Sequence, residues 1–113
     1  MLSQLTPLIG IAQVVEAPVR PKTAEELTLQ YFGGTRMVKI IQCESQFTQF
    51  NTRGEPLISP TEDTGIAQIN HIWDKKAKEM GLDIYGSTED NLKFARWIYD
   101  TQGVRPWSCS RKV

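Results

Sequence analysis

A carboxyl group interrupts an apolar helical stripe near the middle of this chain. Met37, Ile40 and Ile41 precede Glu44 by seven, four and three residues, which is the spacing of one face of an amphipathic helix. Phe47 continues this face. A carboxyl group on such a face loses solvation, which disfavours its charged form. It can then act as a general acid near neutral pH; the alternative is a glutamate that merely closes the helix or pairs with an arginine.

A second candidate carboxylate lies in the loop TEDTG that follows. Asp63 comes nineteen positions after Glu44, and a folded-back loop of that length can bring it across a cleft. The intervening residues are rich in turn formers, and two short segments, 56–59 and 65–69, could be the strands of a small hairpin or sheet. Two carboxylates in different environments, one apolar and one polar, are the groups that cleave glycosidic bonds.

The residues around both carboxylates form longer motifs. Glu44 opens the run ESQF, and residues 63–70 read DTGIAQIN, which contains a G-x-x-Q element. The ES-x-F and G-x-x-Q elements resemble those of soluble lytic transglycosylases, where the glutamate is the catalytic acid/base. The second run is similar to the D-x-G-I-x-Q-I-N run of animal-type lysozymes, where the aspartate is the second catalytic carboxylate. The resemblance to this lysozyme superfamily covers residues 35–110 and implies that Glu44 and Asp63 are catalytic.

This resemblance implies a fold and a reaction. We expect a mostly α (α+β) lysozyme-like domain, with several helices and a small β hairpin beside the catalytic cleft. The implied reaction cleaves the β-1,4 bond between N-acetylmuramic acid and N-acetylglucosamine in peptidoglycan. The ES-x-F context favours a lytic transglycosylase, for which Glu44 alone can suffice, whereas Asp63 favours a hydrolytic lysozyme that uses both carboxylates. A non-enzymatic glycan-binding or structural module is the alternative of another class, because fold does not fix function.

Four further side chains are candidates for contact with the glycan. Gln68 and Asn70 alternate on one expected strand and would project to the same side, toward N-acetyl groups. Tyr99 lies on the last expected helix, where its hydroxyl needs a polar partner that the cleft would supply. In animal-type lysozymes a tryptophan between a final helix and a cysteine walls the pocket of the catalytic glutamate, and Trp107 has a similar place. For Tyr99 and Trp107, packing in the core is the alternative.

The two cysteines of the chain favour an oxidising compartment. A disulfide between Cys43 and Cys109 would tie the segment of Trp107 to the helix of Glu44. For a small wall-acting domain this pair indicates the periplasm, the cell envelope or the extracellular space. The competing chemistry, a cysteine nucleophile, lacks a recognisable Cys/His motif. His71 is the only histidine, so we expect neither a metal site nor a cofactor.

Helix-capping signals predict the elements that position these residues. Thr23 and Glu26 form a capping-box pattern. Gly81 and Gly103 are placed to end the later helices. The expected helices span about residues 23–32, 35–45, 70–80 and 88–102.

Length and composition limit the possible classes of protein. The 113 residues suffice for one domain with a single modest core, expected at 23–113 after an N-terminal arm or linker at 1–22. A hydrophobic fraction of 40% and balanced charge argue against disorder. Because the formal net charge is zero, attraction to an anionic polymer would have to come from local patches. We expect peptidoglycan glycan strands as the partner, no nucleic acid, no integral membrane segment, and a monomer.

Overall fold

Local sequence signals set the helix boundaries in the computed structural model, which describes residues 20–113. Helix α2 (Ala24–Phe32) begins at the predicted capping box, in which Thr23 and Glu26 each accept a hydrogen bond from the backbone of the other. Arg20, which precedes this helix, forms an ion pair with Glu26 in its first turn. The predicted arm otherwise lies outside the described residues.

Helix α3 (Met37–Ser45) carries Glu44 and begins two residues later than predicted. The side chain of Thr35 still accepts a hydrogen bond from the amide of Met37, at 3.3 Å, so the expected capping residue contributes from one position further out. Met37, Ile40 and Ile41 are all fully buried, as the apolar stripe predicts.

The later helices lie within or close to their predicted ranges, and side chains cap the N-terminal ends of two of them. The 3₁₀-helix η2 (His71–Trp73) leads into α4 (Asp74–Glu79), and η2 is capped by the side chain of Asn70. The amide of Leu82 donates to Ala77 at 2.9 Å, which is the hydrogen bond of a Schellman end. Helix α5 (Thr88–Gln102) is capped by Ser87, and the short 3₁₀-helix η3 (Ser108–Arg111) follows it.

The small sheet differs from the predicted one. Strands β1 (Asp63–Thr64) and β2 (Ile69–Asn70) pair antiparallel, with Asp63 opposite Asn70. The prediction that segments 56–59 and 65–69 are the two strands was therefore wrong. Residues 65–68 form the turn, because Gly65 and Gln68 adopt left-handed φ angles of 75° and 50° that a strand does not allow. The segment 56–59 contributes only isolated bridges.

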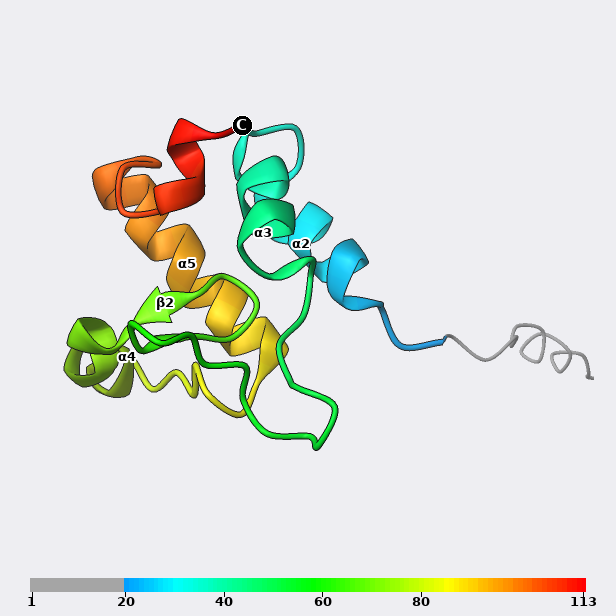
Figure 1. Cartoon of the computed structure of the whole chain (residues 1–113), viewed down its shortest axis with the longest axis vertical. Helices are drawn as coiled ribbons and strands as arrows, with labels where there is room; N and C mark the ends of the chain where they lie inside the picture. The colour runs from blue at the N-terminus through cyan, green and yellow to red at the C-terminus, as the bar shows by residue number, and fades with distance from the viewer. Residues whose placement is uncertain (1–19) are drawn as a thin grey trace, which may run out of the picture.

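Helix α5 runs between two groups of elements, with α2 and α3 on one side and the small sheet and α4 on the other (Figure 1). On one side Tyr99 packs edge-on against Phe32 of α2, with ring centroids 5.9 Å apart. On the other side Trp73 of η2 contacts Phe94 and Trp97. The fold is thus mostly helical with one small antiparallel sheet, which confirms the predicted α+β class at this level.

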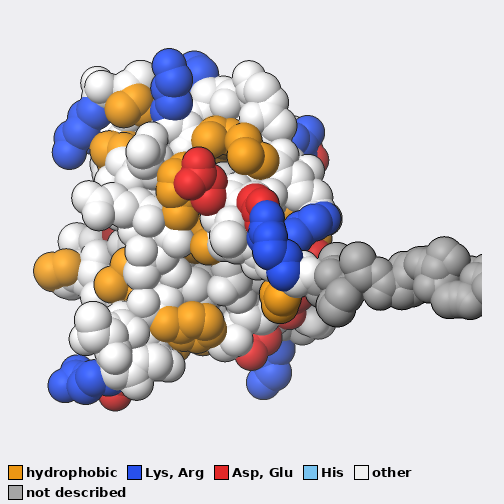
Figure 2. All heavy atoms as spheres, turned by 90° about the vertical axis from the view of Figure 1, so that its right-hand side faces the viewer, with side chains coloured by type: hydrophobic (Ala, Val, Ile, Leu, Met, Phe, Trp, Pro, Cys, Tyr) orange, Lys and Arg blue, Asp and Glu red, His pale blue; other side chains and the backbone are white. Residues whose placement is uncertain are grey.

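The surface carries no strong charge asymmetry on the face shown in Figure 2. Lysine and arginine side chains lie among acidic and apolar ones on this face of the described residues. This distribution agrees with the formal net charge of zero. Among residues 20–113, no helix combines the length and the hydropathy needed to cross a membrane.

Candidate active site around Glu44

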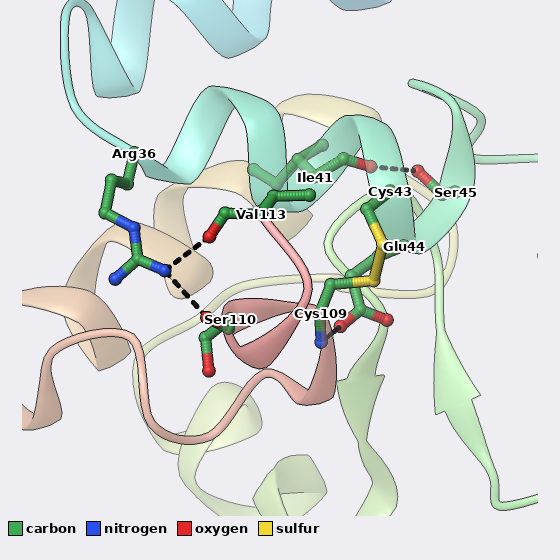
Figure 3. The surroundings of a disulfide bond; sticks show 8 residues. All are labelled: Arg36, Ile41, Cys43, Glu44, Ser45, Cys109, Ser110 and Val113. Atoms are coloured by element: carbon green, nitrogen blue, oxygen red, sulfur yellow. Dashed lines mark hydrogen bonds between the residues drawn. A yellow bond between two sulfur atoms is a disulfide. The ribbon is translucent and has the colours of Figure 1, made fainter.

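The carboxylate of Glu44 is held by one oxygen only. Glu44 lies in the last turn of α3 and is half-buried. Its Oε2 accepts a hydrogen bond of 3.1 Å from the backbone amide of Cys109 (Figure 3). Among residues 20–113, no group donates a hydrogen bond to its Oε1, and this oxygen is not fully buried. One oxygen of this carboxyl group is therefore fixed by the protein, and the other is free to contact a bound molecule.

The chain turns sharply directly after this helix. Gln46 and Phe47 adopt φ angles of 54° and 59°, a conformation that is uncommon for residues other than glycine. The side chain of Ser45 donates a hydrogen bond of 2.6 Å to the carbonyl of Ile66 in the hairpin turn. The helix therefore ends one residue after Glu44, and its end is tied to the hairpin.

Trp107 joins the same hairpin turn to the C-terminal segment. Its indole N–H donates a hydrogen bond of 2.7 Å to the carbonyl of Ala67, and the residue is only 3% exposed. Of the two predicted roles, the structure shows core packing. The ring belongs to the buried core and is not an exposed platform for a sugar.

Asp63 is ionised more readily than an ordinary aspartate. Partial burial acts to raise its pKa, but hydrogen bonds from Thr61, Asn70 and Ser59 outweigh this effect and lower the pKa below its usual value. The Asn70 amide donates to Oδ1 at 2.8 Å, and the Ser59 hydroxyl donates to Oδ2 at 3.0 Å. Asp63 is thus a carboxylate at neutral pH, suited to stabilising positive charge and unsuited to donating a proton.

The lowered pKa of Asp63 makes stability depend on pH. Because the folded state holds the pKa below the ordinary value of 3.8, the unfolded chain takes up this proton at a higher pH than the folded protein. The contribution of the ionised Asp63 to folding stability is therefore present above the unfolded-state pKa and is lost as the pH falls through the folded-state pKa. We expect Asp63→Asn to lower the Tm at about pH 6, and we expect this difference from wild type to shrink as the pH falls below 3.8. Thermal unfolding followed by circular dichroism measures this, and a constant difference across that range would contradict it.

A groove of about 850 Å³ lies beside Asp63. It runs between the hairpin with η2 and the end of α5 with the following loop. Glu44 does not line it. A smaller cavity reaches Trp107 and shares Asp63, Asn70, Trp73 and Pro106 with the groove. The residues that line the groove are Asp63, Asn70, Ile72, Trp73, Thr101, Gln102, Arg105 and Pro106.

The two carboxylates are thus connected through the C-terminal segment. Glu44 contacts the backbone of Cys109, and Trp107, two residues earlier, lines a cavity with Asp63. Glu44 thus contacts Cys109 directly, whereas Asp63 shares a small cavity with Trp107 and is the only one of the two carboxylates that lines the groove.

Gln68 and Asn70 do not lie on one strand as predicted. Gln68 belongs to the turn, and its amide nitrogen donates to the carbonyl of Gly65 at 2.9 Å. Asn70 is in β2, where its amide nitrogen donates to Asp63 and to the carbonyl of Thr61. The left-handed conformation of Gln68 breaks the alternation on which the prediction relied. Asn70 still lines the groove, so its contact with a glycan stays a prediction.

Tyr99 is not brought to the groove. Its ring packs on Phe32, with the guanidinium of Arg96 5.3 Å from the ring centroid. It lines a separate hollow together with Arg36 and Val104. Tyr99 thus does not line the groove beside Asp63, because it lies on the face of α5 that packs toward α2 and not on the face of Thr101. Its contact with a glycan stays a prediction.

Two buried side-chain amides, neither of which was among the predicted site residues, hold the hairpin turn. Asn91, which is fully buried, accepts from the amide of Ala67 at 2.9 Å and donates to the carbonyl of Thr64 at 3.1 Å. Gln49 accepts from the amide of Ile66 at 2.8 Å. A Cβ on Gly65 would lie 2.3 Å from the Asn91 amide nitrogen, so only glycine fits there. A signal was present for Asn91, since it occupies the buried stripe of its helix four residues before Ala95.

The predicted disulfide between Cys43 and Cys109 is present, with the two Cα atoms 6.1 Å apart. Because both cysteines are bonded, neither is available as a nucleophile in this state. His71 is exposed, and its Nδ1 lies 4.0 Å from a carboxylate oxygen of Glu62. Within residues 20–113, no three His, Cys, Asp or Glu residues are grouped so as to hold a metal ion.

Comparison with known proteins provides no assignment. No family model matches the chain, and no curated protein or solved structure is significantly similar to it.

Proposed function

We propose that this protein is a lysozyme-like enzyme that cleaves the N-acetylmuramic acid β-1,4 N-acetylglucosamine bond of peptidoglycan, with Glu44 as general acid and base. The observation that carries the proposal is the asymmetric carboxylate: Oε2 is fixed by the Cys109 amide, and Oε1 is left free. The sequence motifs around Glu44 and Asp63 supply the class of substrate.

The mechanism begins with proton transfer from Oε1 of Glu44 to the departing glycosidic oxygen. The resulting carboxylate then accepts a proton from the incoming nucleophile. In a lytic transglycosylase that nucleophile is a hydroxyl of the muramic acid itself, which gives a 1,6-anhydro end. In a hydrolase it is water, which gives a reducing end.

The surroundings of Asp63 favour the lytic transglycosylase. Its two oxygens already accept hydrogen bonds from three side chains, which stabilise the carboxylate and make it a weaker nucleophile. Asp63 is therefore better suited to electrostatic stabilisation of an oxocarbenium-like transition state than to attack on the sugar. The alternative, a hydrolytic lysozyme, is favoured by the position of Asp63 in the groove.

The disulfide supports a location in the periplasm, in the cell envelope or outside the cell. Disulfides persist in such oxidising compartments, and peptidoglycan is reached there.

The proposal is tested by mass analysis of the soluble fragments released from purified peptidoglycan by wild type, Glu44→Gln and Asp63→Asn. Anhydro ends from wild type and Asp63→Asn, with none from Glu44→Gln, would support the transglycosylase. Reducing ends that are lost in both variants would support the hydrolase. Binding to the insoluble wall without release of fragments would overturn the enzymatic proposal and support a glycan-binding module.

A further inference from the structure

Two different bonds connect Cys109 with the end of helix α3. The Sγ atom of Cys109 is bonded to Cys43, and its backbone amide donates to Glu44, the residue next to Cys43 (Figure 3). One residue of the C-terminal segment thus touches two consecutive residues of the helix. The covalent bond therefore controls how far the amide can move from the carboxylate.

Other contacts hold the same segment without reaching Glu44. Trp107 donates to the carbonyl of Ala67 in the hairpin turn, at 2.7 Å. Arg36, at the beginning of α3, donates to the carbonyls of Ser110 and Val113, both at 2.7 Å. These contacts flank Cys109 on either side. They can keep the segment attached when the disulfide is broken, but none of them involves the Glu44 carboxylate.

We propose that the Cys43–Cys109 disulfide is the positioning element of the Glu44 site, so that its reduction disables the site while the domain stays folded. The inference rests on the proposed function for its effect on rate, because Glu44 is the acid and base there. Whether the disulfide positions the Glu44 carboxylate does not depend on any activity. Cys43 and Cys109 are positioning residues, since they act through the Glu44 carboxylate.

The bond is open to a small thiol from the side of Cys43. Cys43 is exposed and lines a hollow of about 570 Å³ beside α3, together with Gln46 and Phe47. Cys109 is only 4% exposed. A thiolate of a dithiol such as dithiothreitol attacks Sγ of Cys43, and Sγ of Cys109 leaves and takes a proton. The second thiol of the reagent then displaces Cys43 and closes the oxidised ring, so two electrons and two protons pass to the protein.

The position of the carboxylate is tested by nuclear magnetic resonance of the Cys109 amide. In the oxidised protein, Glu44→Gln replaces the carboxyl acceptor of this amide with an amide oxygen, and we expect a clear change in its proton shift. After reduction with dithiothreitol, we expect the same substitution to leave that shift unchanged, while the amides of α5 keep their folded positions. A response to Glu44→Gln that survives reduction would overturn the proposal.

The rate is tested with peptidoglycan as substrate, in oxidised and reduced protein. We expect reduction to lower kcat by about 10- to 100-fold with little change in KM, because a misplaced acid costs orientation rather than binding. Reoxidation should restore the rate. The double variant Cys43→Ser/Cys109→Ser should behave like the reduced protein and be insensitive to dithiothreitol, which has no other cysteine to act on. Arg36→Gln is the matched control, since it removes hydrogen bonds from the same segment and should retain most of the kcat.

The outcomes separate this inference from the proposed function. If the oxidised protein releases no fragments, the proposed function fails, and the amide comparison alone decides whether the disulfide positions the carboxylate. If reduced protein remains folded and keeps its kcat, the inference fails and the proposed function stands. Unfolding of both the reduced protein and the double serine variant would also overturn it, because the flanking contacts would then not suffice.

Discussion

Glu44→Gln is expected to lower the rate of glycan cleavage by a factor of about 10² to 10⁴. The glutamine side chain has the size of the glutamate, and its carbonyl oxygen can still accept the hydrogen bond that Oε2 accepts from the Cys109 amide. The group at the free position then has no acidic proton to give. The loss should therefore fall on kcat, while the fold and the binding of the glycan are kept. Initial rates of fragment release, measured by mass analysis, give this comparison.

The matched control for this variant is Glu62→Gln. Glu62 lies next to Asp63, and its side chain is 69% exposed, so the substitution removes one negative charge from the same region without touching Glu44. We expect this variant to cleave at the wild-type rate. Activity of Glu44→Gln within a few-fold of wild type would remove Glu44 from the mechanism.

Asn91→Ala is expected to lower the free energy of unfolding by about 3 kcal/mol. The change deletes the acceptor of the Ala67 amide and the donor to the Thr64 carbonyl, and both interactions are buried. A buried polar group left without a partner costs about 1–3 kcal/mol, and the missing side chain also leaves a small cavity. The Ile84 carbonyl is less affected, because Gln49 also donates to it. Urea unfolding followed by circular dichroism measures the loss.

Lys93→Ala is the control for this second prediction. Lys93 is on the same helix, two residues further on, but it is exposed. Exposed substitutions of this kind change stability by about 0.5 kcal/mol or less. If Asn91→Ala and Lys93→Ala proved equally mild, the hairpin turn would not depend on its buried amide.

The parts of the fold that the sequence predicted depend on local chemistry. The capping box joins Thr23 to Glu26, three positions further on, and α5 ends at the predicted Gly103. Such signals act within a single turn of chain, so they can be read without knowing the tertiary structure. The buried stripe ahead of Glu44 was predicted for the same reason, since a helical period places its members on one face.

The parts that were missed depend on distant residues. Residues 65–69 were predicted to form a strand, but 65–68 are a turn whose backbone groups are satisfied by Gln49 and Asn91, from 17 and 24 residues away. Nothing in this segment itself reveals these partners. The distance of Tyr99 from the groove could not be predicted either, because helical spacing fixes which residues share a face but not which neighbour that face meets.

The contacts around Glu44 also have a consequence for the order of folding. The Cys109 amide lies 65 residues from Glu44 along the chain, and Trp107 lies 40 residues from its acceptor Ala67. Loops of this length must lose their entropy before such contacts form, whereas helices α3 and α5 need only near neighbours. We therefore expect the helix that carries Glu44 to form early and the surroundings of its carboxylate to form late. On this view the surroundings of the Glu44 carboxyl group are among the last parts of the structure that the folding chain acquires.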